Sequence, residues 1–251
     1  MFGVNPKIAI YTIKGLPFYY RNLQLLNNQK RTSAKTFSLG KLHPCLSDRF
    51  SSSGLARGHY FHQDLLVATR IFLNNPGIHV DVGSRIDGFV AHVASFRPIE
   101  VIDIRPLPSQ IPNVSFMQAD MMSPVEDNLV DYCDSLSCLH ALEHFGLGRY
   151  GDPVNYDGYL LGLNNLYRLL KQGGTFYFSV PIGPQRINFD AHRVFSIAYL
   201  LELLDGKYTI DHFSFVDDRG DLHENASLSK SNEENNFGCV YGCGIFELTK
   251  R

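Results

Sequence analysis

Two aspartates that follow consecutive predicted strands are the side chains in this sequence best placed to bind a ligand. Asp103 lies at the end of an apolar stretch, residues 100–104, and Asp120 follows the next such stretch, residues 114–117. The carboxyl ends of neighbouring parallel strands share one edge of a sheet, so we expect both carboxylates in one crevice. A carboxylate at such a position can accept hydrogen bonds from both hydroxyls of a ribose. The alternative for Asp120 is a helix N-cap ahead of Met121.

A turn ahead of Asp103 completes this predicted ligand site. The apolar residues 79–82 predict a strand, residues 83–88 (GSRIDG) a turn, and residues 89–96 a helix, which together form a βαβ unit. Backbone N–H groups at such a turn are free to bind a polar ligand. A dinucleotide fold requires G-x-G-x-x-G, but Arg85 occupies the position of the middle glycine. The sequence therefore disfavours nicotinamide and flavin cofactors and still predicts a nucleoside.

The segment Asp81-Val82-Gly83, with Asp103 after the next strand, resembles the first motif of the class I S-adenosylmethionine-dependent methyltransferases. Gly83 matches the first glycine of that motif, whereas Arg85 and Asp87 replace the next two. The more specific resemblance is the series LEH at residues 142–144, a leucine-rich helix, and LLKQGGTFYFSVP at residues 169–181. If Arg85 fills the space of the missing glycine, the chain is instead a non-catalytic relative that binds a ligand or acts as a scaffold.

The resemblance implies an α/β fold, a Rossmann-like three-layer sandwich with a mostly parallel seven-stranded sheet whose last strand is antiparallel. It implies S-adenosyl-L-methionine as cofactor, held by residues near the strand ends and by the segment before the first strand, where His59 and Tyr60 are further candidates. The expected cofactor-binding residues are Gln63, Asp81, Gly83, Ser84, Arg85, Asp103, Ile104, Asp120, Met121 and Ser137.

Apolar periodicity predicts the remaining elements. Helices are expected at residues 63–73, 157–171 and 194–204, with Gly173-Gly174 stopping the second. Further strands are expected at residues 8–13, 130–137, 175–180, 208–216 and 240–248, and an exposed loop at residues 217–237.

Methyl transfer from a sulfonium is an in-line displacement, so the enzyme mainly positions the acceptor and removes its proton. A base speeds transfer to a hydroxyl or amide by roughly 10²–10⁴-fold. The candidates that follow the fourth strand are His140, Glu143, His144, Tyr150 and Asp152, and His192 follows the fifth. We predict His144 or His192 as the base; the alternative for each is a packing or capping role.

Residues 140–144 (HALEH) also match H-x-x-E-H, the inverted zinc-protease pattern, in which two histidines on one helical face bind zinc and the glutamate is the base. That chemistry needs a third ligand, for which the sequence shows no clear pattern. A zinc hydrolase is therefore a minor alternative, and the leading interpretation contains no metal.

Composition places the chain among ordinary soluble enzymes. Of its 251 residues 44% are apolar and 19% charged, and the formal net charge is −2, which gives no argument for nucleic acid or a membrane as partner. Five cysteines without C-x-x-C indicate reduced, mostly buried thiols in a cytoplasmic protein. Residues 1–53 are expected to form an extension, a lid or an oligomer contact in a homo-oligomer, and residues 54–251 the methyltransferase-like domain.

The combination of DVGSRIDGFVAHV, VIDIRP and EHFGLGRYGDP also resembles an uncharacterised bacterial family associated with surface-glycan pathways. That resemblance implies a small carbohydrate-like acceptor, such as a sugar or sugar nucleotide. O-methylation is expected rather than N-methylation.

Overall fold

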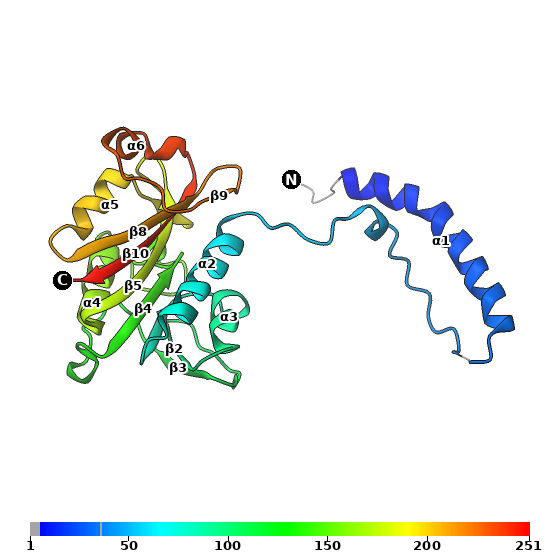
Figure 1. Cartoon of the computed structure of the whole chain (residues 1–251), viewed down its shortest axis with the longest axis horizontal. Coiled ribbons are helices and arrows are strands. Elements are labelled where there is room, and N and C mark those ends of the chain that lie inside the picture. Colours follow the sequence, from blue (N-terminus) through cyan, green and yellow to red (C-terminus); the bar gives the residue numbers. More distant parts are fainter. Residues whose placement is uncertain (1–5, 36) are drawn as a thin grey trace. The chain divides into compact units, whose positions relative to one another are not determined.

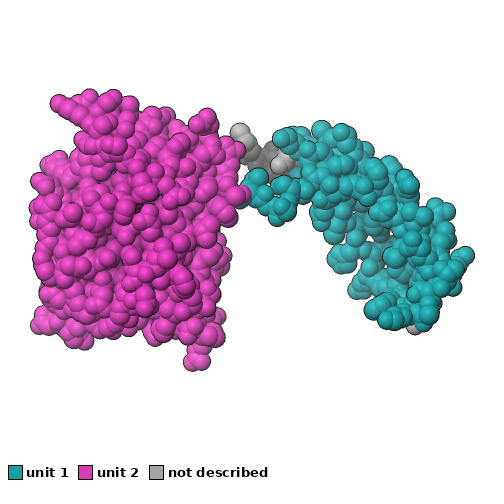
Figure 2. Space-filling view, viewed as in Figure 1, with its two compact units in different colours: residues 1–55 teal, residues 56–251 magenta. Residues whose placement is uncertain are grey.

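The computed structural model describes residues 6–35 and 37–251. The chain divides into two compact units, Met1–Leu55 and Ala56–Arg251, shown in teal and magenta in Figure 2. Among the described residues, no helix combines the length and the apolar character that a membrane crossing needs.

The first unit consists of the long helix α1 (Pro6–Thr32) and the short helix η1 (Asp48–Phe50). Tyr11 stacks on Phe50 with 5.2 Å between ring centroids, and Phe18 meets the same ring edge-on. The isoleucines of residues 8–13 suggest a strand, and that prediction is wrong. The described part of this unit contains no strand to pair with, whereas a helix satisfies its own backbone hydrogen bonds. Pro6 at the first helical position favours this outcome.

The second unit is built on an eight-stranded sheet of order β3-β2-β1-β4-β5-β10-β8-β9 (Figure 1). The first five strands pair in parallel, and β10 runs antiparallel between β5 and β8. The strands are β1 (His79–Val82), β2 (Ile99–Asp103), β3 (Val114–Gln118), β4 (Cys133–Leu139), β5 (Leu170–Ile182), β8 (Tyr208–Val216), β9 (Leu222–His223) and β10 (Gly242–Lys250). The predicted mostly parallel sheet with an antiparallel last strand is confirmed, and the two-residue β9 makes eight strands instead of seven.

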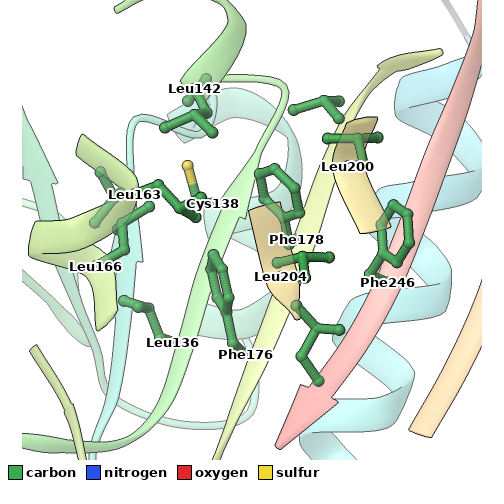
Figure 3. Packing of buried hydrophobic residues seen from close by; sticks show 14 of the residues in the cluster. Leu136, Cys138, Leu142, Leu163, Leu166, Phe176, Phe178, Leu200, Leu204 and Phe246 are labelled. Atoms are coloured by element: carbon green, nitrogen blue, oxygen red, sulfur yellow. The ribbon is translucent and has the colours of Figure 1, made fainter. Parts of the chain in front are cut away.

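Helices cover both faces of this sheet, which gives the three layers (Figure 1). Helices α2 (His59–Asn74) and α3 (Ala91–Ala94) lie on one face, and α4 (Gly158–Leu169) and α5 (Ile197–Leu204) lie on the other. Alternation along β5 supplies both cores: Phe176 and Phe178 pack toward Leu166 and Leu200 (Figure 3), and Tyr177 joins the opposite cluster. Two buried faces explain why this strand reads as a continuous apolar run.

Several boundaries differ from the predicted ones because local pairing overrides the apolar pattern. Helix α5 begins at Ile197, three residues late, because His192–Val194 forms β7 and pairs with β6 (Arg186–Asn188). Helix α4 already ends at Leu169, and Gly173-Gly174 lies inside the extended β5. The loop at residues 217–237 contains β9 and the short helix α6 (Lys230–Glu234).

The burial of α4 gives a stability prediction. Leu166 is fully buried in the core, so Leu166→Ala should lower the free energy of unfolding by about 2–5 kcal/mol. Leu161 on the same helix is 44% exposed, and Leu161→Ala should change it by less than about 0.5 kcal/mol. Urea unfolding of both variants measures the contrast; equal losses would contradict this packing of α4 on the sheet.

Candidate active site

A cavity of about 350 Å³ lies at the carboxyl ends of β1, β2 and β4, where the strand order reverses between β1 and β4. Open α/β sheets bind ligands at this switch point. Six of the predicted cofactor-binding residues line it, together with three of the predicted catalytic residues and Tyr60. These are Gly83, Arg85, Asp103, Ile104, Asp120 and Met121, then His144, Tyr150 and Asp152. The lining also contains Ala119, Met122, Leu139, Ala141 and Phe145, which sequence patterns did not single out.

Gly83 is the glycine of the turn with a positive φ. Its φ is +76°, so any other residue would strain the turn. A Cβ there would also come within 2.7 Å of the Ala141 Cβ, in the segment that follows β4. Arg85 has φ −70°, an ordinary value for any residue. The replacement of the motif's second glycine therefore costs the backbone nothing here.

Arg85 does not fill the cavity. Its guanidinium forms a salt bridge with Asp87 at 2.8 Å, and both side chains are more than half exposed. The guanidinium carbon also lies 5.7 Å from the centre of the Tyr60 ring. The arginine therefore forms part of the cavity rim and leaves the interior open.

Asp103 lies on the cavity wall but is bound by a neighbour. Both carboxylate oxygens accept hydrogen bonds from the Arg105 guanidinium, at 2.9 and 2.6 Å, and Oδ1 also accepts one from the Arg105 backbone N–H. The guanidinium carbon of Arg105 lies 4.7 Å from the centre of the Tyr150 ring. Arg105 thus links the strand-end carboxylate to the loop on the other side of the cavity.

Asp120 also faces the cavity, and its Oδ1 accepts a hydrogen bond from the Met122 backbone N–H at 2.9 Å. This contact turns the chain after β3, and no α-helix begins there, so the helix-cap alternative does not hold. Among the described residues, none donates a hydrogen bond to the other carboxylate oxygen, Oδ2.

A buried polar chain lies directly behind the cavity and contains three of the other predicted cofactor residues. Ser137 Oγ donates to Asp81 Oδ1 at 2.5 Å, and Asp81 also accepts from the Ser84 hydroxyl and backbone N–H. Ser137 has only one proton to donate, so His79 Nε2–H donates to Ser137 Oγ and His79 Nδ1 accepts from Ser135. Asp81, Ser84 and Ser137 therefore hold β1, its turn and β4 together and do not line the cavity.

Burial shifts the pKa of both ionisable groups in this hydrogen-bond network, Asp81 and His79. It raises the pKa of Asp81 to about 6, although the hydrogen bonds from Ser137 and Ser84 oppose the shift. It lowers the pKa of His79 to about 3. Gln63, the remaining predicted cofactor residue, is also buried, and its side chain bonds Ser179 and Asp64 instead of facing the cavity.

His144 has the geometry of a base at the cavity wall. Its Nδ1 lies 2.6 Å from the Ala191 carbonyl oxygen, which can only accept, so Nδ1 carries the proton and Nε2 keeps its lone pair. Burial lowers the pKa of His144, although Glu143, 3.8 Å from Nε2, opposes the shift. Its ring packs against Tyr150 and against His192, which is not part of the cavity lining and bonds Asn188.

Asp152 organises the loop that carries Tyr150. Its two oxygens accept hydrogen bonds from three backbone N–H groups, those of Gly146, Gly148 and Tyr150, at 2.8 to 3.1 Å. Because three backbone N–H groups already bind its oxygens, a proton-transfer role for Asp152 has little support in the geometry.

Glu143 is 1% exposed and pairs with His140, whose Nδ1 lies 2.7 Å from Oε1. Burial alone would raise the pKa of Glu143, but His140 and His144 lower it below its usual value. The zinc-hydrolase alternative is wrong, because it needs His140 and His144 on one helical face. His140 instead follows β4 with φ +52°, and only Leu142–His144 forms a short helical turn.

The His140 ring lies between two rings from the start of α2. His59 stacks on it with 5.2 Å between centroids, and Tyr60 lies at the same distance on a tilted plane. Burial and the neighbouring His140 lower the pKa of His59 to about 4. The predicted approach of His59 and Tyr60 to the site is therefore seen, although only Tyr60 lines the cavity.

The profile of a protein family described as "Caenorhabditis protein of unknown function, DUF268" matches residues 109–238, just over half of the chain. The chain belongs to this family. The DUF268 match begins ahead of β3 and ends ahead of β10, so it includes Asp120, Glu143 and His144 but not Asp103. No curated protein matches the sequence.

Solved structures share the fold of this DUF268 chain. The 1,6-didemethyltoxoflavin-N1-methyltransferase of Burkholderia thailandensis, with bound 1,6-didemethyltoxoflavin and S-adenosylhomocysteine, is 15% identical over 77% of this chain and 79% of its own, with a TM-score of 0.52. The N-methyltransferase NodS of Bradyrhizobium japonicum WM9, in complex with S-adenosylhomocysteine, is 12% identical over 77% and 88%, with a TM-score of 0.50. The [4+2]-cyclase SpnF is 16% identical over 75% and 80%, with a TM-score of 0.51. The second unit therefore has the class I methyltransferase fold.

The buried His79 gives a prediction about pH. Its pKa of about 3 in the folded chain is below the ordinary 6.5, so the unfolded chain binds the proton more readily and stability falls as pH drops below 6.5. Between pH 7 and 4.5 this one group should remove roughly 2–3 kcal/mol from the free energy of unfolding. Over the same interval the free energy of unfolding of His79→Gln should fall by that much less than that of the wild type. Asp81 makes a contribution of opposite sign, but it is present in both proteins and cancels in the comparison.

Urea unfolding at the two pH values measures this difference. His212→Asn, an exposed histidine on β8, is the control and should keep the wild-type pH dependence. Parallel curves for the wild type and His79→Gln would contradict a neutral, buried His79.

Proposed function

We propose that this DUF268 chain is an S-adenosylmethionine-dependent methyltransferase. The observation that carries the proposal is the cavity at the β1–β4 switch point, which has Asp103 and Asp120 on its wall and Gly83 at its floor. A volume of about 350 Å³ lies within the range of small-molecule sites. The neighbours named as methyltransferases, two of them bound to S-adenosylhomocysteine, support the same cofactor.

The residues present fit an adenosyl group. Asp103 would accept hydrogen bonds from the ribose hydroxyls once Arg105 turns away, and the free oxygen of Asp120 would accept from the adenine amino group. The apolar side chains of Ile104 and Met121 would flank the adenine ring. Arg85 on the rim is available to the carboxylate of the methionine moiety, since the Asp87 that it pairs with is exposed. S-adenosylmethionine supplies a methyl group on a sulfonium sulfur.

His144 is the side chain best placed to take a proton from the acceptor. It lines the cavity, its Nε2 has a free lone pair, and Ala191 fixes the orientation of its ring. Its lowered pKa keeps the imidazole neutral near pH 7, the form that can act as base. His192 contacts the His144 ring and Tyr241 but does not line the cavity, so we assign it a positioning role.

The proposed acceptor is a small carbohydrate-like molecule methylated on oxygen. Arg85, Arg105 and Arg149 reach the cavity beside Tyr60 and Tyr150, with both Arg105 and Arg149 over the Tyr150 ring. Guanidinium groups bind hydroxyls and phosphates, and aromatic faces stack on sugar rings, so this rim suits a sugar or sugar nucleotide. The fold alone does not set the chemistry, since SpnF with the same fold is a cyclase.

The cofactor proposal is tested by Asp103→Ala. Loss of the ribose hydrogen bonds should weaken S-adenosylhomocysteine binding by roughly 10–100-fold, since hydrogen bonds to a charged group contribute about 1.5–3 kcal/mol. Isothermal titration calorimetry measures the Kd. Asp205→Ala, an exposed carboxylate after α5, is the matched control and should bind like the wild type. Unchanged affinity in Asp103→Ala, or no binding by the wild type, would refute the proposal.

The base assignment is tested by His144→Asn. Turnover, followed as S-adenosylhomocysteine release with a panel of sugars and sugar nucleotides, should fall by roughly 10²–10⁴-fold. The Kd for S-adenosylhomocysteine should stay within a few-fold of the wild type, because Nε2 acts on the acceptor. His212→Asn should keep wild-type turnover. A variant His144→Asn with full turnover would exclude this histidine as base.

A further inference from the structure

Three metal-ligating side chains from distant parts of the chain meet beside the cavity. His59 starts α2, His140 follows β4, and Cys243 is the second residue of β10. One ligand atom of each lies within 4.8 Å of the other two, and within the described residues this is the one group of three or more His, Cys, Asp or Glu side chains with such spacing. Neither the family match nor the methyltransferase fold accounts for it.

An unsatisfied nitrogen points to a missing ligand at this cluster. His140 Nδ1 bonds Glu143 Oε1 at 2.7 Å, so Nε2 is the nitrogen left for the cluster. His140 Nε2 is buried and neither donates a hydrogen bond to nor accepts one from any residue that the structure describes. A buried polar atom without a partner costs about 1–3 kcal/mol and calls for an explanation such as an unseen ion.

The surrounding groups are those that prepare histidines to bind metal. Glu143 accepts the proton of His140 Nδ1, which directs Nε2 to the cluster and increases its basicity. Although burial opposes the shift, Cys243 and Glu143 raise the pKa of His140. A hydrogen bond to the Tyr241 backbone helps to orient the His59 ring. Cys243 Sγ is fully buried and makes weak contacts with Gln63 at 3.8 Å and Gly244 at 3.7 Å. It also interacts with His140 and helps to raise the pKa of that histidine.

The backbone of His140 also indicates a functional position. Its φ of +52° lies in the left-handed region, which is unfavourable for a histidine. The Ser179 carbonyl and hydroxyl both accept from the His140 backbone N–H and hold it there. The strained backbone keeps the imidazole between His59 and Tyr60 rather than in solvent.

We propose that His59, His140 and Cys243 bind a zinc ion at the inner wall of the cavity. Two imidazole nitrogens and one thiolate form a typical zinc donor set with one position open. On binding, Cys243 releases its proton to solvent, so the site gains one positive charge overall. The negative charge that a thiolate and Glu143 concentrate around His140 favours a cation at this place.

The position of His140 links this ion to the cavity, since the same residue lines it. The fourth ligand would come from the cavity as water or as an oxygen of the bound acceptor. If the methyltransferase proposal holds, the ion would lower the pKa of an acceptor hydroxyl and complement His144. The zinc site itself does not depend on that function.

Cobalt substitution of the full-length protein tests the site directly. Chelator-treated protein titrated with Co²⁺ should take up one ion and show the near-ultraviolet charge-transfer band of a cobalt-bound thiolate, and one equivalent of Zn²⁺ should abolish it. Cys243→Ser should lose the band and bind Zn²⁺ at least roughly 100-fold more weakly, as measured by calorimetry. Cys239→Ser, another buried cysteine just ahead of β10, is the matched control and should keep both properties.

Two further variants protect the test against misfolding of Cys243→Ser. His59→Ala changes a partly buried residue at the start of α2 and should bind Zn²⁺ at least about tenfold more weakly, with an unchanged circular dichroism spectrum. Glu143→Gln should weaken binding by roughly 10–100-fold and keep the band, because the thiolate remains. Absence of a thiolate band in the wild type, or a band that survives in Cys243→Ser, would overturn the proposal.

Calorimetry with S-adenosylhomocysteine on the same preparations separates this inference from the proposed function. Protein that binds zinc through Cys243 but no S-adenosylhomocysteine would keep the metal site and refute the methyltransferase. Protein that binds S-adenosylhomocysteine but no zinc would do the reverse. Binding of S-adenosylhomocysteine without zinc is the result expected if His140 and Cys243 instead form a buried imidazolium–thiolate pair.

Discussion

The site depends on one buried carboxylate, that of Asp81. It is fully buried at the end of β1 and holds the turn through Ser84 and the neighbouring β4 through Ser137. Removing a buried carboxylate from water costs several kcal/mol unless hydrogen bonds satisfy it, so both serines must stay in place. The two strands on either side of the switch point are thereby fixed to each other, and the cavity opens where they diverge.

Sequence patterns located the sheet and the strand ends well for a physical reason. A largely buried parallel strand such as β2 must be mostly apolar, and the chain must turn after it, so the position of Asp103 followed from the sequence pattern. Asp120 follows the edge strand β3, which is partly exposed and still contains apolar residues. The N-terminal helix shows the limit of this reasoning. Three isoleucines at residues 8–13 have high strand propensity, but a strand needs a partner, and no sequence pattern reveals whether one exists.

The inner residues of the site illustrate a second limit. Asp81, Ser84, Ser137 and Gln63 belong to the motifs that suggest cofactor contact, yet their side chains point into the protein and hold other side chains. A period of two places a residue on one face of a strand, but does not tell whether that face meets the ligand or a helix. The H-x-x-E-H pattern misled in the same way, since it presumes a helix, and the left-handed His140 ends any such regularity.

The cluster around His140 could not be found from the chain in order, because its members are 81 and 103 residues apart along the sequence. Cys243 in a strand looks like a small core residue, and His59 ahead of a helix looks like a surface residue. They meet because β10 enters the sheet beside β5, while α2 packs over the same end of the sheet. Because β10 runs antiparallel to β5, its first residues lie at the carboxyl end of β5, on the same edge of the sheet as the cavity. This arrangement places the proposed zinc site next to the cavity proposed for the cofactor, because His140 belongs to both.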